Sequence, residues 1–104
     1  MIDPNNETTH KAREFVMRVT IAEHLNRLQA QESNRPPAIR REVPNMTDLA
    51  RQVGVSRATL YNFDNGRTRK INIDVMTEII NYLNQCGLDT DIPDLLTLYP
   101  SDLA

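Results

Sequence analysis

Apolar residues recur at helical spacing along most of this chain of 104 residues, and their positions locate the helices. The pattern predicts an all-α fold, a compact bundle of about five helices with an N-terminal extension. The predicted helices cover residues 11–31, 46–53, 57–63, 72–87 and a short segment from Pro93 that includes Leu95, Leu96 and Leu98. In the first helix, the β-branched run Val19-Thr20-Ile21 leaves a short strand near residues 15–19 as an alternative.

Capping residues mark where these helices begin and end. Asn45 and Ser56 precede the second and third helices, and each can accept a hydrogen bond from an amide of the first turn. Gly54 lies between these helices, where a left-handed residue can end the first of them. Asn65-Gly66 ends the third helix, and Asn72 begins the fourth. The second and third helices with their short turn form a helix-turn-helix.

Polar and proline-rich segments divide the chain into parts. Residues 1–10 are polar and are predicted to form a disordered tail. Residues 32–44 contain three prolines and three arginines without an apolar period, which predicts a linker. Residues 45–99 form the predicted helix-turn-helix core, and residues 100–104 a C-terminal tail.

The third helix has side chains suited to contact with DNA. Arg57, Thr59, Tyr61 and Asn62 occupy its polar positions, while Leu60 and Phe63, between and beyond them, should face inward. A helix of this kind can place hydrogen-bonding groups in the major groove while its apolar face is held by the domain.

The distribution of charge agrees with DNA binding although the net charge is −2. Residues 35–70 carry eight Lys and Arg against three Asp and Glu, a net charge of +5. Residues 71–104 carry six acids and no base, a net charge of −6, and residues 1–34 contribute −1. A local basic region is typical of phosphate binding, so the acidic third should point away from DNA.

Residues 46–99 resemble the phage-repressor and Cro-like (XRE) helix-turn-helix family, whose fold is lambda-repressor-like. The matching features are Leu49-Ala50, Gly54-Val55-Ser56, Thr59-Leu60, Asn65-Gly66, the basic run Arg67-Thr68-Arg69-Lys70 and the helix from Asn72. The resemblance implies a bundle of about five helices and a bacterial or phage-encoded regulator of transcription that is cytoplasmic and nucleoid-associated.

The resemblance also implies which residues contact DNA. Helix 56–63 corresponds to the recognition helix. Its residues at family positions that touch base edges are Arg57, Ala58 and Asn62. Those expected at the phosphate backbone are Ser56, Thr59, Tyr61, Arg67, Thr68, Arg69 and Lys70. Met46 stands where many relatives place a phosphate-binding glutamine, and Arg40 and Arg41 are candidates to supply that contact instead.

The function predicted from these features is a sequence-specific DNA-binding transcriptional regulator of the repressor type. Because one recognition helix reads only a few base pairs, two copies should act together on an inverted-repeat operator in double-stranded DNA. The residues expected to form this homodimer are Leu95, Leu96, Leu98, Tyr99 and Leu103, with the segment 15–21. Two alternatives remain open: the antitoxin of a toxin–antitoxin pair, which also autoregulates, and a protein-interaction adaptor that does not bind DNA.

Enzymatic, metal-dependent and membrane functions find no support in the sequence. His10 and His24 are the only histidines, 14 positions apart and without a nearby cysteine, so no zinc spacing is present, and His24 is expected at or near the surface. No glycine-rich phosphate loop occurs, and no cofactor is expected. No apolar run approaches the ~20 residues of a membrane span. The single Cys86 and the polar N-terminus without a signal-peptide core suit the cytoplasm.

Overall fold

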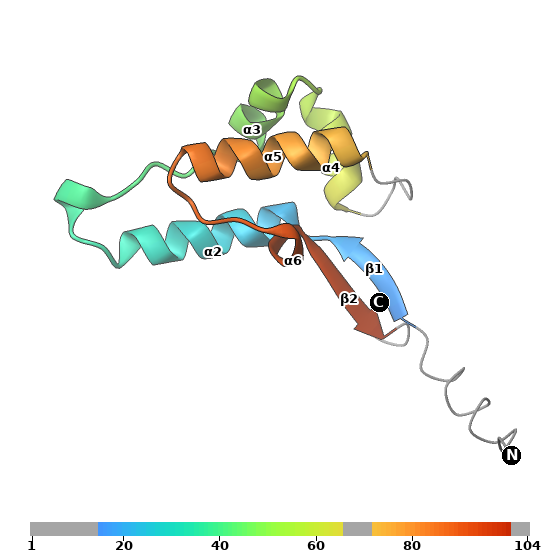
Figure 1. The fold of residues 1–104 in the computed structure, drawn as a ribbon, viewed down its shortest axis with the longest axis horizontal. Coiled ribbons are helices and arrows are strands. Elements are labelled where there is room, and N and C mark those ends of the chain that lie inside the picture. The colour runs from blue at the N-terminus through green and yellow to red at the C-terminus, as the bar shows by residue number, and fades with distance from the viewer. Residues whose placement is uncertain (1–14, 66–71, 101–104) are drawn as a thin grey trace, which may run out of the picture.

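A computed structural model describes residues 15–65 and 72–100 of the chain (Figure 1). In chain order its elements are β1 (Phe15–Val19), α2 (Ile21–Ser33), the 3₁₀-helix η1 (Pro37–Ile39), α3 (Met46–Val53), α4 (Arg57–Asp64), α5 (Ile73–Gln85), α6 (Ile92–Leu95) and β2 (Leu96–Pro100). Five α-helices within these residues confirm the predicted helical bundle, to which the two strands add a small sheet.

The two ends of the described chain pair with each other. β1 and β2 form an antiparallel ribbon in which Phe15 lies opposite Pro100 and Val19 opposite Leu96. The strand near residues 15–19 is therefore present, and the first helix begins only at Ile21. Figure 1 shows that the ribbon projects from the helical body at the end where α2 begins.

The prediction of a C-terminal helix through Leu98 is wrong. α6 contains four residues and ends at Leu95, and Leu96 and Leu98 belong to β2. Its start is strongly specified, because Asp91 and Asp94 form a reciprocal capping box and Pro93 occupies the first turn. The helix ends at Leu95 because the next five residues form β2, whose backbone groups bond to the amides and carbonyls of β1.

The core lies where all five helices meet. Each helix contributes a side chain with almost no exposed surface, and the loop after α5 adds another. These fully buried side chains are Ile21, Leu49, Leu60, Ile79, Leu83, Leu88 and Leu95. Ala50 of α3 is also buried, at 2% exposure. Removal of this apolar area from water is the main stabilising contribution to the fold.

His24 is buried rather than at the surface, which corrects the expectation from sequence. Only 3% of it is exposed, and its Nε2 lies 2.9 Å from Oγ1 of Thr90. The Thr90 hydroxyl donates to the carbonyl of Leu88 and so accepts the proton on Nε2. Burial lowers the pKa of His24, an effect opposed by Asp94 and reinforced by Arg27. The ring is therefore neutral and ties α2 to the loop before α6.

Candidate nucleic-acid interface

The helix-turn-helix is held by two side-chain caps and a left-handed glycine that the sequence indicated. The side chain of Asn45 accepts from the amide of Asp48 at 2.8 Å, and that of Ser56 accepts from the amide of Thr59 at 3.0 Å. Gly54 ends α3 with a φ of 80°, a left-handed backbone that other residues adopt only with strain. The carbonyl of Ala50 is satisfied by the amide of Val55 at 3.0 Å. This turn fixes the direction in which α4 leaves α3.

One side of α4 is anchored in the core. Leu60 and Phe63, three residues apart, are 1% and 6% exposed and belong to the apolar core. Because these side chains are packed, α4 cannot rotate about its axis without leaving cavities. The opposite side of the helix is therefore presented in a fixed orientation.

The exposed side of α4 carries the residues predicted to contact DNA. Arg57, Ala58 and Asn62 are all exposed, and Tyr61 is 39% exposed beside them. The Arg57 guanidinium lies 5.3 Å from the centre of the Tyr61 ring, a cation–π contact one turn along the helix. Positions 57, 58, 61 and 62 share one face at 3.6 residues per turn, so the structure brings the three predicted base-contacting residues together.

Ser56 and Thr59 lie at the N-terminal end of α4. The Ser56 hydroxyl donates to that of Thr59 at 2.7 Å, and both residues are exposed. The helix N-terminus carries a partial positive charge and free amides, which favour an anion such as a phosphate. Met46 is buried at 6% exposure, so it offers no group to DNA.

The other predicted backbone-contacting residues are placed elsewhere or lie outside the described residues. Residues 67–70 are not described. Arg40 donates to the carbonyls of Arg35 and Ser33, both at 2.9 Å, and thereby completes the C-terminal end of α2. The Arg41 guanidinium lies 3.7 Å from the buried carboxylate of Glu32. These contacts hold both arginines at the C-terminal end of α2, which Figure 1 shows at the opposite end of the molecule from α4.

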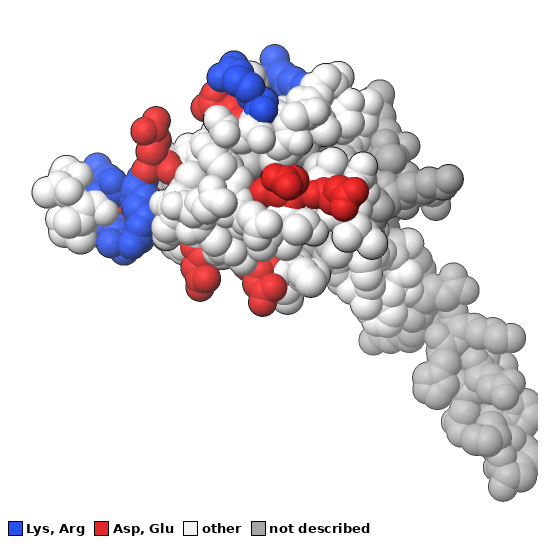
Figure 2. Space-filling model, turned by 45° about the horizontal axis from the view of Figure 1, so that its top comes forward, with Lys and Arg blue, Asp and Glu red and all other residues white. Residues whose placement is uncertain are grey.

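Charged side chains are unevenly distributed over the surface. Figure 2 shows basic side chains over the linker and again over the helix-turn-helix, and acidic side chains over α5 on the same face of the molecule. The acids of α5 are Asp74 and Glu78, both exposed. That the acidic C-terminal third points away from DNA stays a prediction.

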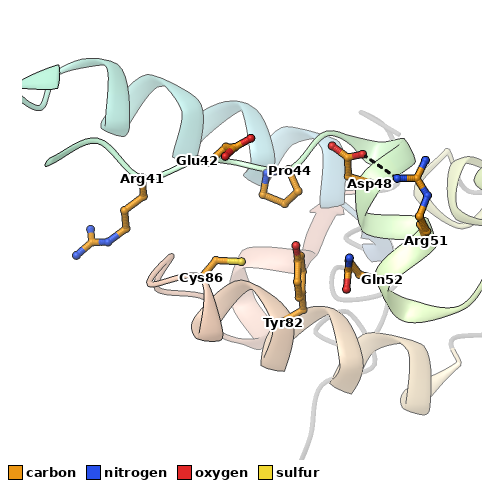
Figure 3. Close-up of a pocket in the computed structure, with 8 residues that line it drawn as sticks. All are labelled: Arg41, Glu42, Pro44, Asp48, Arg51, Gln52, Tyr82 and Cys86. Atoms are coloured by element: carbon orange, nitrogen blue, oxygen red, sulfur yellow. Dashed lines mark ion pairs between the residues drawn. The ribbon is translucent and has the colours of Figure 1, made fainter. Parts of the chain in front are cut away.

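An open pocket of about 450 Å³ lies between the linker, α3 and α5 (Figure 3). Two arginines and two acids line it, and Asp48 and Arg51 pair at 3.5 Å, so it has no net charge to attract an anion. Tyr82 and Cys86 form its α5 side, and a hydrogen bond between them raises the pKa of Tyr82. The pocket does not include the exposed residues of α4.

Two residues that the sequence analysis did not single out connect α4 and the ribbon to α2. Asp64, in the last turn of α4, accepts from the amide of Ala22 at 3.0 Å. Thr20 donates its amide to the carbonyl of Leu95 at 2.8 Å. One signal was present in the sequence: an acid in the last turn of a helix opposes the helix dipole and so needs a compensating partner.

The part of the chain that the structure describes offers no metal site or membrane span. No three His, Cys, Asp or Glu side chains of residues 15–65 and 72–100 gather in a group that could hold a metal ion. Among the same residues, no helix is both long and apolar enough to cross a bilayer.

α3 and α4 are both capped, and α4 buries an apolar side and exposes a polar one. These two helices define a helix-turn-helix DNA-binding domain. Residues 38–101, about three fifths of the chain, match the Cro/C1-type HTH DNA-binding domain family. The chain belongs to this family, which confirms the resemblance drawn from sequence. Searches of curated proteins and of solved structures found no match.

Proposed function

We propose that this DNA-binding protein is a sequence-specific regulator of transcription, of the repressor type, that reads the major groove with α4. The observation that supports this most directly is the division of α4 into a buried apolar face and an exposed face with Arg57, Ala58 and Asn62. A rigidly held helix with free hydrogen-bonding groups can distinguish base pairs by their groove edges. A repressor can act by occupying its operator, which a DNA-binding domain does without any further activity.

Each exposed residue has a role suited to its chemistry. Arg57 can donate two hydrogen bonds to guanine, Asn62 can pair with adenine, and the methyl group of Ala58 fits against a thymine methyl. Ser56, Thr59 and Tyr61 are proposed to contact phosphates, as are residues 67–70. The contact with Tyr61 holds the Arg57 side chain along the helix, which reduces the conformational entropy cost when it binds a base.

The ribbon supports the proposal that two copies act together. Three cross-strand pairs place only apolar side chains on one of its faces: Phe15 with Pro100, Met17 with Leu98, and Val19 with Leu96. Phe15, Met17 and Leu98 are 52%, 57% and 55% exposed. A two-stranded ribbon is only marginally stable alone in water, and an apolar face gains stability when another protein surface covers it. A second copy is the occupant that an inverted-repeat operator requires.

The same apolar face favours a second candidate function. An antitoxin that autoregulates would bind DNA through α4 and its toxin through an exposed apolar surface of this kind. A protein-interaction adaptor would use the ribbon alone and leave α4 without a role. The alternatives differ from the repressor in the identity of the molecule that covers the ribbon.

Selection from a random pool of double-stranded DNA tests the proposal with the full chain. We expect an enriched inverted repeat whose half-sites lie about 34 Å apart, one turn of DNA. Sedimentation of the free protein should show a dimer at micromolar concentration. Failure to enrich any sequence would contradict the proposed function, and a single unrepeated site bound by a monomer would contradict the dimer.

Salt dependence tests the proposed backbone contacts separately. Binding should weaken steeply as salt rises, because basic side chains displace counterions from the phosphates. Replacement of Arg67, Arg69 and Lys70 by alanine should reduce the slope by roughly one unit for each phosphate that the variant no longer neutralises. As a matched control, Arg40→Ala and Arg41→Ala measure whether the linker contributes to the same slope. A triple variant with an unchanged slope would place residues 67–70 away from DNA.

A further inference from the structure

The N-terminus of α2 is capped by a side chain from another helix. Thr20 occupies the N-cap position, but its side chain makes no capping hydrogen bond. The carboxylate of Asp64, from the end of α4, takes that place and accepts from the amide of Ala22 at 3.0 Å. An amide of the first turn needs such a partner, and the positive end of the α2 dipole favours the negative charge.

Thr20 instead forms hydrogen bonds with residues at the base of the ribbon. Its amide donates to the carbonyl of Leu95, and its hydroxyl donates to the carbonyl of Asp94 at 3.4 Å. The same hydroxyl lies 3.1 Å from that of Thr97, a residue of β2. Thr20 therefore connects the turn between β1 and α2 with the turn between α6 and β2.

The recognition helix and the ribbon are thus fastened to the same three residues. Asp64 binds at Ala22, the ribbon binds at Thr20, and Ile21 between them is completely buried in the core. Ile21 prevents this segment from shifting, because movement would open a cavity. Leu60 and Phe63 hold α4 in the core and α4 also contacts β1, and the bond of Asp64 adds a fixed point at the C-terminal end of α4, beside the base of the ribbon.

We propose that Asp64 is a positioning residue that sets the half-site spacing of the operator. The inference rests on the proposed function, in which α4 reads each half-site and the ribbon joins two copies. In such a dimer the distance and angle between the two recognition helices depend on how each α4 is fixed relative to its ribbon. Asp64 provides that connection on the α4 side, and Thr20 provides it on the ribbon side.

The test is a series of operators that differ only in spacer length. The half-sites are those selected by the wild-type chain, and the spacer is lengthened or shortened by one or two base pairs. Each inserted base pair rotates and displaces one half-site, so the wild-type dimer should lose about tenfold in affinity per base pair. The Asp64→Ala variant should lose less, about threefold, because the C-terminal end of α4 loses its bond to α2 and its angle to the ribbon becomes less strictly fixed.

Three further variants separate positioning from other effects. Asp64→Asn keeps an oxygen that can accept from the amide of Ala22 and should retain the wild-type optimum. Thr20→Val removes the hydroxyl at the ribbon and should broaden the optimum as Asp64→Ala does. Glu78→Ala removes an exposed acid of α5 and controls for the change in net charge. Affinity for a single half-site, measured in parallel, should keep the same base preference in all variants.

The outcomes distinguish this inference from the proposed function. If Asp64→Ala lowers thermal stability but keeps the sharp optimum, Asp64 has only a structural role and the inference is overturned. If Asp64→Ala does not fold, Thr20→Val decides, and a sharp optimum in that variant overturns the inference. A wild-type chain that binds half-sites without any spacing preference overturns the inference and leaves DNA binding intact. A wild-type chain that binds no duplex overturns both.

Discussion

α4 and the ribbon expose opposite kinds of surface. α4 buries Leu60 and Phe63 and presents arginine, asparagine and hydroxyl groups to solvent. The ribbon leaves Phe15, Met17 and Leu98 more than half exposed on one apolar face. A surface of free donors and acceptors suits a polar, charged ligand, whereas an apolar face suits a protein. The difference supports the proposals that α4 contacts nucleic acid and that the ribbon contacts a protein partner.

Replacement of leucine by alanine should change the free energy of unfolding by very different amounts in the two regions. Leu60→Ala removes a side chain that is 1% exposed and should lower the free energy of unfolding by about 2–5 kcal/mol at any protein concentration. Leu98→Ala removes one that is 55% exposed and should change the stability of the dilute monomer by less than about 0.5 kcal/mol. Urea unfolding at low and high protein concentration measures both.

The Leu98 variant should lose stability mainly where the wild-type chain associates, since association stabilises the folded state by mass action. Sedimentation of the variant provides the complementary measurement and should show more monomer. A Leu98 variant as unstable in dilute solution as the Leu60 variant would mean that the ribbon belongs to the monomer core.

Within the proposed DNA-binding surface, an arginine that bonds a base edge and one that bonds the backbone should differ in the effect of their replacement. Arg57→Ala should lose roughly 1–3 kcal/mol of discrimination at one base pair, because the side chain is proposed to bond a base edge. Arg69→Ala should weaken binding to all sequences alike. Binding to a panel of single-base operator variants distinguishes them, with circular dichroism as the control for folding. Equal loss on every sequence for Arg57→Ala would remove its proposed base contact.

The smallest expected effect is a pH dependence of the stability that arises from His24 in α2. Burial lowers the pKa of His24 below 6.5, so below about pH 6.5 the unfolded chain binds a proton that the folded chain does not. Stability should therefore fall as the pH decreases through this range and level off once the folded ring also titrates. Protonated Nδ1 would face the Arg27 guanidinium, 3.4 Å away, while Asp94 partly compensates.

Urea midpoints measured from about pH 7.5 to 5 test the His24 prediction. His24→Gln keeps a donor that can reach Thr90 but cannot titrate, so it should flatten the dependence below pH 6.5. An identical pH profile in wild type and His24→Gln would show that other groups determine the acid sensitivity.

The helix-turn-helix could be predicted from sequence because its signals are local. Asn45, Gly54 and Ser56 lie within a few residues of the helix ends that they define, and Leu60 and Phe63 repeat at helical spacing. The match of the chain to the Cro/C1-type family confirms this part. The exposure of Arg57, Ala58 and Asn62 agrees with the predicted site, while their contacts with bases remain predictions.

The ribbon, His24 and Asp64 could not be placed in the same way because their partners are distant in the chain. Leu96 and Leu98 suit a short helix by spacing, and only pairing with β1, about 80 residues earlier, makes them a strand. His24 is buried by Thr90, 66 residues away, and Asp64 meets Ala22 across 42 residues. No periodicity within a segment indicates which remote segment it will meet.

The pairing of β1 with β2 makes the ribbon more sensitive to deletions than to substitutions. Side chains alternate between the two faces, so Met17 and Leu98 lie on the apolar face and Arg18 and Thr97 on the other. Loss of one residue from β1 would exchange the faces of all residues on one side of the deletion and place Arg18 among the apolar side chains. Conservative apolar exchanges at positions 15 and 17 preserve the pattern. Over evolutionary time, this segment should therefore accumulate replacements that keep the alternation of its two faces, and it should keep its length.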